Sequence, residues 1–201
     1  MSADGTSLYD ASSARDATPA GGSAGRGAPP RVVVMGVSSC GKSTVGEMLA
    51  LKLGLPFMDG DDLHPAENIA KMESGTPLDD DDRWPWLTLV GRWLADHDGG
   101  VIACSALKRS YRDRIREAAP DTVFVHLHGS RELMGARMAA RPGHFMPTSL
   151  LDSQFATLEL LGDDEAGRVY DVSMTPGDIT DHAAEWLRRS GEARPLPRAA
   201  S

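Results

Sequence analysis

Residues 31–53 read RVVVMGVSSCGKSTVGEMLALKL, and this stretch decides the fold class. Residues 31–35 form a short apolar, β-branched run, which is typical of a strand buried on both faces of a sheet. Residues 42–53 carry apolar side chains at helical spacing, at Val45, Met48, Leu49 and Leu53. Between this strand and this helix, residues 36–43 match G-x-x-x-x-G-K-S, the pattern of a phosphate-binding loop. Because the motif follows a predicted buried strand and precedes a predicted helix, we predict that the chain binds a nucleoside triphosphate there.

The phosphate-binding loop predicts roles for its own residues. Its glycines let the backbone curl so that N–H groups converge on phosphate oxygens, and the dipole of the following helix adds partial positive charge. Lys42 would reach the β- and γ-phosphates of ATP as a catalytic residue, and the Ser43 hydroxyl would bind Mg²⁺. The predicted ATP-binding residues of the loop are Gly36, Val37, Ser38, Ser39, Cys40, Gly41, Lys42, Ser43 and Thr44. The helix terminus is expected to lower the pKa of the Cys40 thiol, although we interpret Cys40 as a neutral filler with some sensitivity to oxidation.

Strands and helices alternate along the rest of the chain. Further strands are predicted over residues 56–59, 101–104, 122–127 and 169–174, and helices over residues 108–118, 130–140, 148–161 and 178–189. A strongly amphipathic helix runs from Trp86 to Leu94, with Asp82 as its N-cap and Pro85 in its first turn. Five short strands that alternate with helices imply a parallel sheet with right-handed crossovers. We therefore predict an α/β protein with the three-layer P-loop NTPase fold and a five-stranded parallel sheet.

The two ends of the chain differ from the part between them. Ala, Gly, Ser and Pro supply 20 of the first 30 residues, which leaves too little apolar surface to offset the entropy of ordering. We expect a disordered tail over residues 1–30, one P-loop kinase domain over residues 31–190 and a frayed end over residues 191–201. A misassigned start codon and a regulatory arm are alternative explanations of the first segment.

Charge and composition disfavour several classes of protein. The formal net charge is −8, and nine of the 29 acidic residues fall within residues 59–82, where Lys71 is the single base. Such a chain is not a globally basic binder of nucleic acid. No apolar run is long enough for a membrane span or a signal peptide, and two cysteines make neither a disulfide framework nor a four-thiolate zinc site. We expect a cytoplasmic protein that binds neither nucleic acid nor a membrane.

The positions of the acidic residues distinguish between kinds of NTP-binding protein. A GTPase would carry Asn-Lys-x-Asp, which is absent, and residues 96–99 (DHDG) match D-x-x-G only behind a helix, where we interpret them as a capping turn. A motor-type ATPase would carry an acidic residue at the end of a later apolar strand, but the third predicted strand runs into Cys104-Ser105-Ala106. Instead, Asp59 and Asp61 follow the second predicted strand. This arrangement favours a small-molecule kinase, with metal and acceptor hydroxyl beside the γ-phosphate.

Several longer stretches resemble the gluconokinase family, namely residues 59–65 (DGDDLHP), 68–72 (NIAKM), 75–87 (GTPLDDDDRWPWL), 104–108 (CSALK), 111–113 (YRD), 141–145 (RPGHF) and 154–155 (QF). The resemblance covers residues 31 to about 188, with a departure at residues 160–162 (LLG), where the family more often carries Glu-Pro. It implies a gluconokinase of the thermoresistant type, in which ATP and D-gluconate give 6-phospho-D-gluconate and ADP. It also implies a nucleoside-monophosphate-kinase-like fold, a mobile lid at about residues 136–150 and a homodimer.

Within this resemblance, the acceptor side has candidate residues of its own. We expect Asp61 to orient and deprotonate the acceptor hydroxyl and Asp59 to hold Mg²⁺ through water, although both carboxylates could simply cap the next turn. Arg83 is predicted to bind the carboxylate of the sugar acid, because a cation is otherwise disfavoured in a first helical turn. His64 would contact substrate hydroxyls or order its loop. Lys108 is expected to act in catalysis and substrate binding, facing the γ-phosphate or gluconate, with surface charge as the alternative.

Other polar residues receive less specific interpretations. Arg137 and Arg141 resemble lid arginines that close over the phosphates of ATP, with solvent-facing side chains as the alternative. The acidic run at residues 79–82 is interpreted as a solvated helix N-terminus. His126 and His128 share one face of a predicted strand, and packing is favoured there over metal binding.

Two rival functions stay open from the sequence. A shikimate-kinase-like enzyme would need Gly-Gly-Gly after the third strand, where this chain has Ser105-Ala106-Leu107. A non-catalytic, nucleotide-dependent regulator would keep the phosphate-binding loop as a switch, and the intact acidic residues argue against it.

Overall fold

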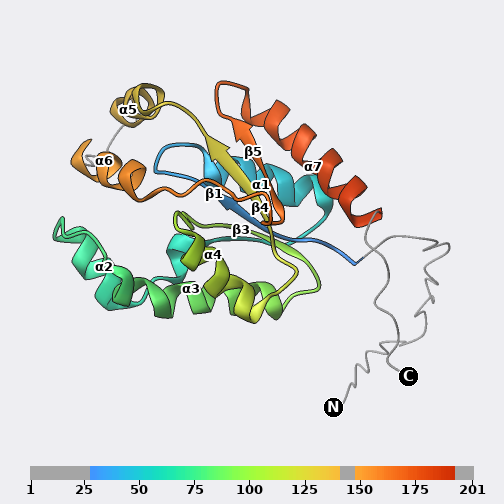
Figure 1. Cartoon of the computed structure of the whole chain (residues 1–201), viewed down its shortest axis with the longest axis horizontal. Helices are drawn as coiled ribbons and strands as arrows, with labels where there is room; N and C mark the ends of the chain where they lie inside the picture. The colour runs from blue at the N-terminus through green and yellow to red at the C-terminus, as the bar shows by residue number, and fades with distance from the viewer. Residues whose placement is uncertain (1–27, 141–147, 193–201) are drawn as a thin grey trace, which may run out of the picture.

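The computed structural model describes residues 28–140 and 148–192 (Figure 1). Residues 1–27 and 193–201, which hold most of the two predicted tails, lie outside the described residues. So do residues 141–147 of the predicted lid, with Arg141 among them. Among the helices that are described, none is both long and apolar enough to cross a membrane.

A five-stranded, wholly parallel sheet forms the centre of the molecule, as predicted, with strand order β2-β3-β1-β4-β5. The strands are β1 (Arg31–Met35), β2 (Phe57–Asp59), β3 (Gly100–Ala103), β4 (Val123–His128) and β5 (Gly167–Asp171). β1 is the middle strand, and Val33 pairs with Ile102 on one side and with Phe124 on the other. The carboxyl ends of the strands meet at one edge, and the residues that follow β1, β2 and β3 converge there (Figure 1).

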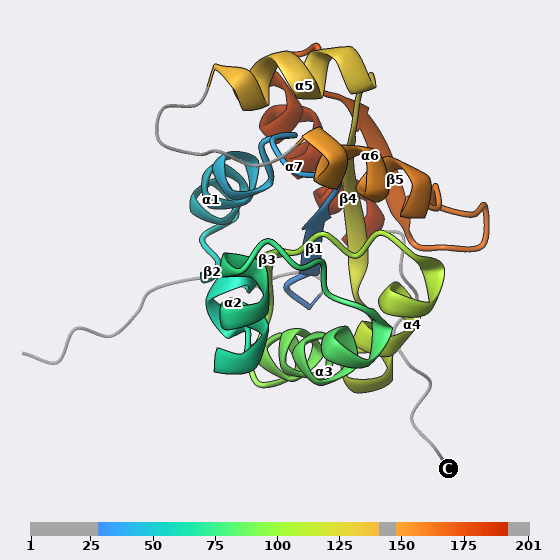
Figure 2. The ribbon, with the colours of Figure 1, turned by 90° about the vertical axis from the view of Figure 1, so that its left-hand side faces the viewer.

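Helices cover both faces of this sheet and complete three layers. The helices are α1 (Lys42–Leu53), α2 (Ala66–Glu73), α3 (Asp80–Ala95), α4 (Arg109–Ala118), α5 (Arg131–Ala139), α6 (Thr148–Thr157) and α7 (Pro176–Glu192), with a 3₁₀ turn, η1, at Gly60–Leu63. Figure 2 shows α3 and α4 below the sheet and α1 and α7 above it. A hydrophobic core lies on each face of the sheet, and alternate residues of β1 point into the two cores. Val32 and Val34 pack toward α1 and α7, while Val33 and Met35 pack toward α3 and α4.

The start of α3 differs from the prediction. Its N-cap is Asp79, not Asp82: the Asp79 carboxylate accepts from the N–H of Asp82 at 3.0 Å, and the Asp82 carboxylate accepts from the N–H of Asp79 at 2.8 Å. This reciprocal pair is a capping box, and it places the cap three residues earlier than hydrophobic periodicity suggests. Pro85 consequently lies in the second turn of a continuous helix rather than in the first.

Two other predicted boundaries are wrong because tertiary contacts override local pattern. α6 ends at Thr157 rather than at residue 161, since the N–H of Glu159 donates to the carbonyl of Leu107 at 2.9 Å. The last strand covers Gly167–Asp171 rather than residues 169–174. Pairing with β4 begins at Gly167, and the N–H of Ser173 donates to the Asp171 side chain at 2.7 Å, which turns the chain there.

Candidate active site

The phosphate-binding loop joins β1 to α1 through positive φ angles at Gly36 and Gly41 and, in a non-glycine residue, at Ser39 (φ 63°). Gly36 has φ 143°, and a side chain there would bring its Cβ to 2.4 Å from the carbonyl oxygen of Leu127. Gly41, with φ 97°, is the N-cap of α1. The N–H of Gly36 donates to the carbonyl of Ser105 at 3.3 Å, so the loop is tied to the segment after β3. The predicted sequence of strand, loop and helix is confirmed.

Two side chains at this loop, those of Lys42 and Ser43, make contacts that bear on their predicted roles. The hydroxyl of Ser43 donates to Oδ2 of Asp59 at 2.6 Å, which joins α1 to the end of β2. The ammonium of Lys42 donates to the carbonyl of Val37 at 3.1 Å and is therefore folded over the loop. A hydroxyl beside a carboxylate is a set of hard oxygen ligands that suits Mg²⁺, which commonly binds one or two protein oxygens together with substrate phosphates.

Asp59 and Asp61 flank the tight turn at the end of β2. Asp59 caps η1 by accepting from the N–H of Asp61 at 3.1 Å, so the capping interpretation holds for Asp59 alongside its contact with Ser43. The Asp61 side chain is 81% exposed and therefore open to a ligand. Gly60 between them is required, because an added Cβ would lie 2.4 Å from the carbonyl oxygen of Ala103.

The pKa values of Cys40 and Cys104 depend on burial and on the charged groups at this edge of the sheet. Burial raises the pKa of Cys104, at the end of β3, to about 12, and the charges of Asp61, Lys42 and Asp59 also act on its thiol. Burial likewise raises the pKa of Cys40, against the lowering effect of Lys42 and, more weakly, Arg137. The expectation of a lowered Cys40 pKa is therefore wrong, because desolvation outweighs the helix terminus and the nearby cations. Both thiols stay protonated near neutral pH.

His64 is built into the loop after β2. Its ring stacks on Trp86 with centroids 4.2 Å apart, and its Nδ1 lies 3.3 Å from the side-chain amide of Asn68. The side chain of His64 is only 5% exposed, and burial lowers its pKa, so the imidazole is neutral at pH 7. The indole N–H of Trp86 donates to the carbonyl of Gly60 at 2.7 Å. Of the two roles expected for His64, ordering the loop is the one that these contacts support.

A second polar cluster lies across α3 and the start of α4. Nζ of Lys108 is 2.9 and 2.8 Å from the two carboxylate oxygens of Asp80, and the hydroxyl of Tyr111 donates to Asp80 at 2.5 Å. Arg83 reaches the same hydroxyl at 3.5 Å, and its guanidinium lies 5.7 Å from the centre of the Tyr111 ring. The hydrogen bonds from Lys108 and Tyr111 hold the pKa of Asp80 below its usual range. Arg83 and Lys108, predicted separately, therefore share one cluster.

Asp80 and Tyr111 belong to this cluster, although neither of them is assigned a role in the site from the sequence. The prediction of a solvated run at residues 79–82 does not hold for all four acidic residues, because their surroundings differ: Asp79 and Asp82 form the capping box, and Asp80 binds Lys108. The spacing of Asp79 and Asp82 could have revealed the capping box, but nothing local indicates a partner 28 residues further along the chain.

Gln154 of α6 contacts the phosphate-binding loop. The N–H of Ser38 donates to the Gln154 side chain at 2.6 Å, and the amide of Gln154 donates to the Ser38 hydroxyl at 3.0 Å. Gln154 is assigned no role from the sequence, because nothing in the local pattern indicates this contact between α6 and the loop. Arg137 donates to the carbonyl of Val172 at 2.6 Å, while its charge still acts on Cys40 within the loop.

His126 and His128 lie beside each other on β4. The His126 side chain is fully buried, neither of its nitrogens has a hydrogen-bond partner, and burial lowers its pKa to about 4. Its ring lies edge-on to that of His128, with centroids 5.5 Å apart. Throughout residues 28–140 and 148–192, no group of three or more His, Cys, Asp or Glu side chains could hold a metal ion. The favoured packing interpretation fits these surroundings.

Taken together, the phosphate-binding loop, the pairing of Ser43 with Asp59 and the exposed carboxylate of Asp61 lie at the carboxyl ends of a parallel sheet. In open α/β sheets this edge is where ligands bind. This combination of fold and site defines an ATP-dependent kinase of the P-loop class.

Comparison with known proteins identifies the family within this class. The gluconokinase of Gluconobacter oxydans is 51% identical over 144 residues, which make up 69% of this chain and 81% of that protein. The crystal structure of a gluconokinase from Sinorhizobium meliloti superposes with a TM-score of 0.78 at 50% identity, over 84% of this chain and 97% of that one. The chain belongs to the gluconokinase family.

Two further comparisons also point to small-molecule kinases. The thermosensitive gluconokinase of Escherichia coli is 42% identical over 158 residues, which make up 76% of this chain and 84% of that protein. A family model described as shikimate kinase matches residues 38–161, from the phosphate-binding loop to the segment after α6. That model covers a kinase domain, whereas the relatives named above, at 42–51% identity, are gluconokinases.

Proposed function

We propose that this chain transfers the γ-phosphoryl group of ATP to the 6-hydroxyl of D-gluconate, giving 6-phospho-D-gluconate and ADP. The observation that carries the proposal is membership of the gluconokinase family together with an exposed carboxylate, Asp61, next to the phosphate-binding loop. A bond forms between the 6-oxygen of gluconate and the γ-phosphorus, the bond from that phosphorus to the bridging oxygen of ADP breaks, and the hydroxyl proton leaves to a base.

On the nucleotide side, Lys42 turns from the Val37 carbonyl to the β- and γ-phosphates when ATP binds. Ser43 and Asp59 would hold Mg²⁺, directly and through water respectively, and their 2.6 Å contact supports this assignment. When bound, the metal neutralises charge on the β- and γ-phosphates. Arg137 and Arg141 belong to the lid in this proposal, and the field of Arg137 at Cys40 supports its place near the phosphates.

On the acceptor side, Asp61 orients the 6-hydroxyl and takes its proton. Its exposure supports this role, because the group must reach a substrate rather than a protein partner. Arg83 binds the carboxylate at the opposite end of gluconate, since a guanidinium matches a carboxylate with two parallel hydrogen bonds. Asp80 holds Lys108 at 2.8 Å beside Tyr111, and Lys108 in turn binds gluconate hydroxyls or the transferring phosphoryl group.

Other parts of the proposal follow from the family alone. Two copies of the chain would form a homodimer located in the cytoplasm, and light scattering after size exclusion tests the first of these statements. The lid at about residues 136–150 would close on ATP.

The decisive experiment measures ADP release with gluconate, shikimate, nucleoside monophosphates and glycerate as parallel acceptors. We expect release with gluconate to exceed release with each other acceptor by orders of magnitude, and mass spectrometry should detect 6-phosphogluconate. Faster turnover with shikimate would favour the rival that the family model suggests. ATP binding without turnover on any acceptor would favour a nucleotide-dependent regulator.

A further inference from the structure

The loop between β3 and α4 has an unfavourable backbone conformation at Ala106. Ala106 has φ 41°, in the left-handed region that residues with a Cβ seldom adopt. This loop carries Ser105, whose carbonyl binds the N–H of Gly36, and it ends at Lys108, the N-cap of α4. Such a conformation persists only where surrounding contacts determine it. Backbone N–H groups of Gly36 and Glu159 hold the loop at Ser105 and Leu107, and the side chain of Arg112 adds further hydrogen bonds to it.

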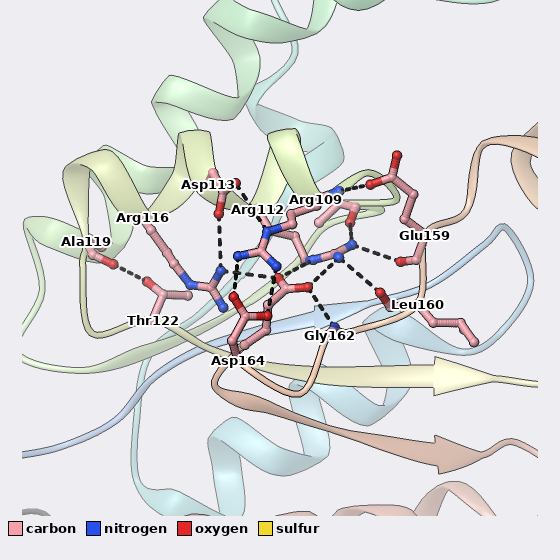
Figure 3. Close-up of polar contacts among 12 residues, drawn as sticks. Arg109, Arg112, Asp113, Arg116, Ala119, Thr122, Glu159, Leu160, Gly162 and Asp164 are labelled. Atoms are coloured by element: carbon pink, nitrogen blue, oxygen red, sulfur yellow. Dashed lines mark hydrogen bonds and ion pairs between the residues drawn. The ribbon is translucent and has the colours of Figure 1, made fainter.

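Arg112 projects from α4 back onto this loop and onto the segment after α6. Its Nη1 donates to the carbonyls of Ala106 and Leu107, both at 3.3 Å, and to the carbonyl of Glu159 at 3.0 Å. Its Nη2 donates to the carbonyl of Leu160 at 3.3 Å (Figure 3). The Arg112 guanidinium therefore connects the loop that precedes Lys108 with the segment that follows α6.

Glu165 fixes the orientation of this guanidinium. Its two carboxylate oxygens accept from Nε and Nη2 of Arg112, both at 2.7 Å, in a bidentate pair. The carboxylate also accepts from the N–H of Gly162 at 3.0 Å and from Arg116 at 3.2 Å. The side chains of Arg112 and Glu165 are each 1% exposed, so removing either would leave a buried, uncompensated charge.

We propose that Arg112, held by Glu165, is a positioning residue for phosphoryl transfer. It touches no reacting atom; it sets the loop that carries Ser105 and Lys108, and it fixes the exit of α6, whose Gln154 contacts Ser38 of the phosphate-binding loop. The buried ion pair between Arg112 and Glu165 thereby fixes the position of α6 relative to the loop that carries Lys108. The expected change in kcat rests on the proposed kinase function, whereas the expected change in hydrogen exchange does not.

Adjacent acidic residues provide a matched pair of variants. Glu165→Gln removes the buried charge that orients Arg112, whereas Asp164→Asn removes the exposed partner of Arg109, at 2.7 Å on the same segment. We expect Glu165→Gln to lower kcat by about tenfold or more while KM for ATP changes little, because a displacement of about 1 Å at reacting groups is enough for a loss of about a hundredfold. Asp164→Asn should retain kcat within about twofold. Glu165→Asp, which keeps the charge but shortens its reach, should recover part of kcat.

A double-mutant cycle separates positioning from general stability. If Arg112 acts through Lys108, then Arg112→Lys should lower kcat much less in a Lys108→Ala background than in the wild type. Equal effects in the two backgrounds would overturn the positioning role, as would a Glu165→Gln enzyme with wild-type kcat. Thermal unfolding of each variant shows whether it is folded at the assay temperature.

Hydrogen exchange tests the same inference without any acceptor. The amides of Glu159 and Gly36 donate to the carbonyls of Leu107 and Ser105, so peptides containing them report how firmly the loop is held. We expect faster exchange at both amides in Glu165→Gln but not in Asp164→Asn. Unchanged exchange would contradict the inference whichever acceptor the enzyme uses. Failure of the wild type to phosphorylate gluconate would instead contradict the proposed function and leave the exchange result valid.

Discussion

Asp61 and Arg83 lie at different parts of the site, so substitutions of the two residues should have different effects on kcat and on KM for gluconate. Asp61 is exposed beside the phosphate-binding loop, whereas Arg83 reaches the Tyr111 hydroxyl at the second cluster. Asp61→Asn keeps the shape but loses the base, so kcat should fall while KM for gluconate changes little. Arg83→Ala should chiefly raise KM for gluconate, by about 10- to 100-fold, because a hydrogen bond to a charged group contributes about 1.5–3 kcal/mol.

Steady-state kinetics with gluconate varied at saturating ATP measures this contrast. The affinity for ATP, measured by titration, is the control and should survive in both variants, since neither residue belongs to the phosphate-binding loop. Near-normal kcat in Asp61→Asn would remove Asp61 from the role of base. An unchanged KM for gluconate in Arg83→Ala would leave Arg83 with only its packing against Tyr111.

Among single side chains, the sequence predicted those residues whose neighbours are set by the local motif. Ser43 follows β1 and Asp59 ends β2, the carboxyl ends of these strands lie at the same edge of the parallel sheet, and the two side chains are 2.6 Å apart there, while their binding of Mg²⁺ stays a prediction. The environment of Asp80 could not be predicted in this way, because its partners Lys108 and Tyr111 come from another helix. The burial that raises the pKa of Cys40 is likewise a property of the packed core and not of the loop motif.

Among the helices, α3 offers a direct test of its capping box. Asp79→Ala removes the side chain that accepts from the Asp82 N–H and that lies 3.1 Å from Lys71. We expect the free energy of unfolding to fall by about 1 kcal/mol, as for other N-cap substitutions, with a decrease in Tm of about 2–4 °C.

The matched control for this substitution is Asp81→Ala. Asp81 is exposed in the same first turn, so its loss changes the charge of the helix terminus without removing the cap. Denaturant titrations of both variants at one pH should separate the two contributions. An equal loss of stability in the two variants would show that charge near the helix N-terminus, rather than the capping box, stabilises α3.

The bounds of a helix or strand could be predicted where the local sequence sets both ends. They were wrong where a contact with a distant part of the chain ends the element. The strand β1 and the helix α1 have the predicted bounds, because apolar periodicity and glycines define both ends. α6 stops four residues early because Glu159 bonds to Leu107 and gives its own carbonyl to Arg112. No pattern within residues 148–161 contains that information, since both partners lie more than forty residues earlier.

For the folded chain, the buried pair of Arg112 and Glu165 predicts a stability that depends on pH. Burial alone would raise the pKa of Glu165, but hydrogen bonds from Arg112 and from the Gly162 N–H reverse that effect and lower the pKa to about 2. A carboxylate with a depressed pKa stabilises the folded state above its unfolded value of 4.5 and loses that contribution as the pH falls toward 2. The full contribution is about 3 kcal/mol, of which about 2 kcal/mol should be lost by pH 3.

Urea unfolding between pH 6 and pH 3, on wild type and Glu165→Gln, measures this contribution (about six pH values suffice). The wild type should lose more free energy of unfolding across the interval, while Asp164→Asn should follow the wild type closely, since its ion pair is exposed and screened by solvent. Parallel curves for wild type and Glu165→Gln would mean that Glu165 is no more acidic in the folded chain than in the unfolded one.

The middle strand of the sheet is also synthesised before the other four strands of that sheet. Val32 pairs only with Val101 and Val123 on its two sides, so β1 has no partner until those residues have been synthesised. During that interval residues 32–35, which are fully buried in the finished protein, face solvent or other nascent chains. Unpaired apolar strands of this kind initiate aggregation and recruit chaperones. A slow passage of translation through residues 36–123 would therefore prolong the exposure of β1.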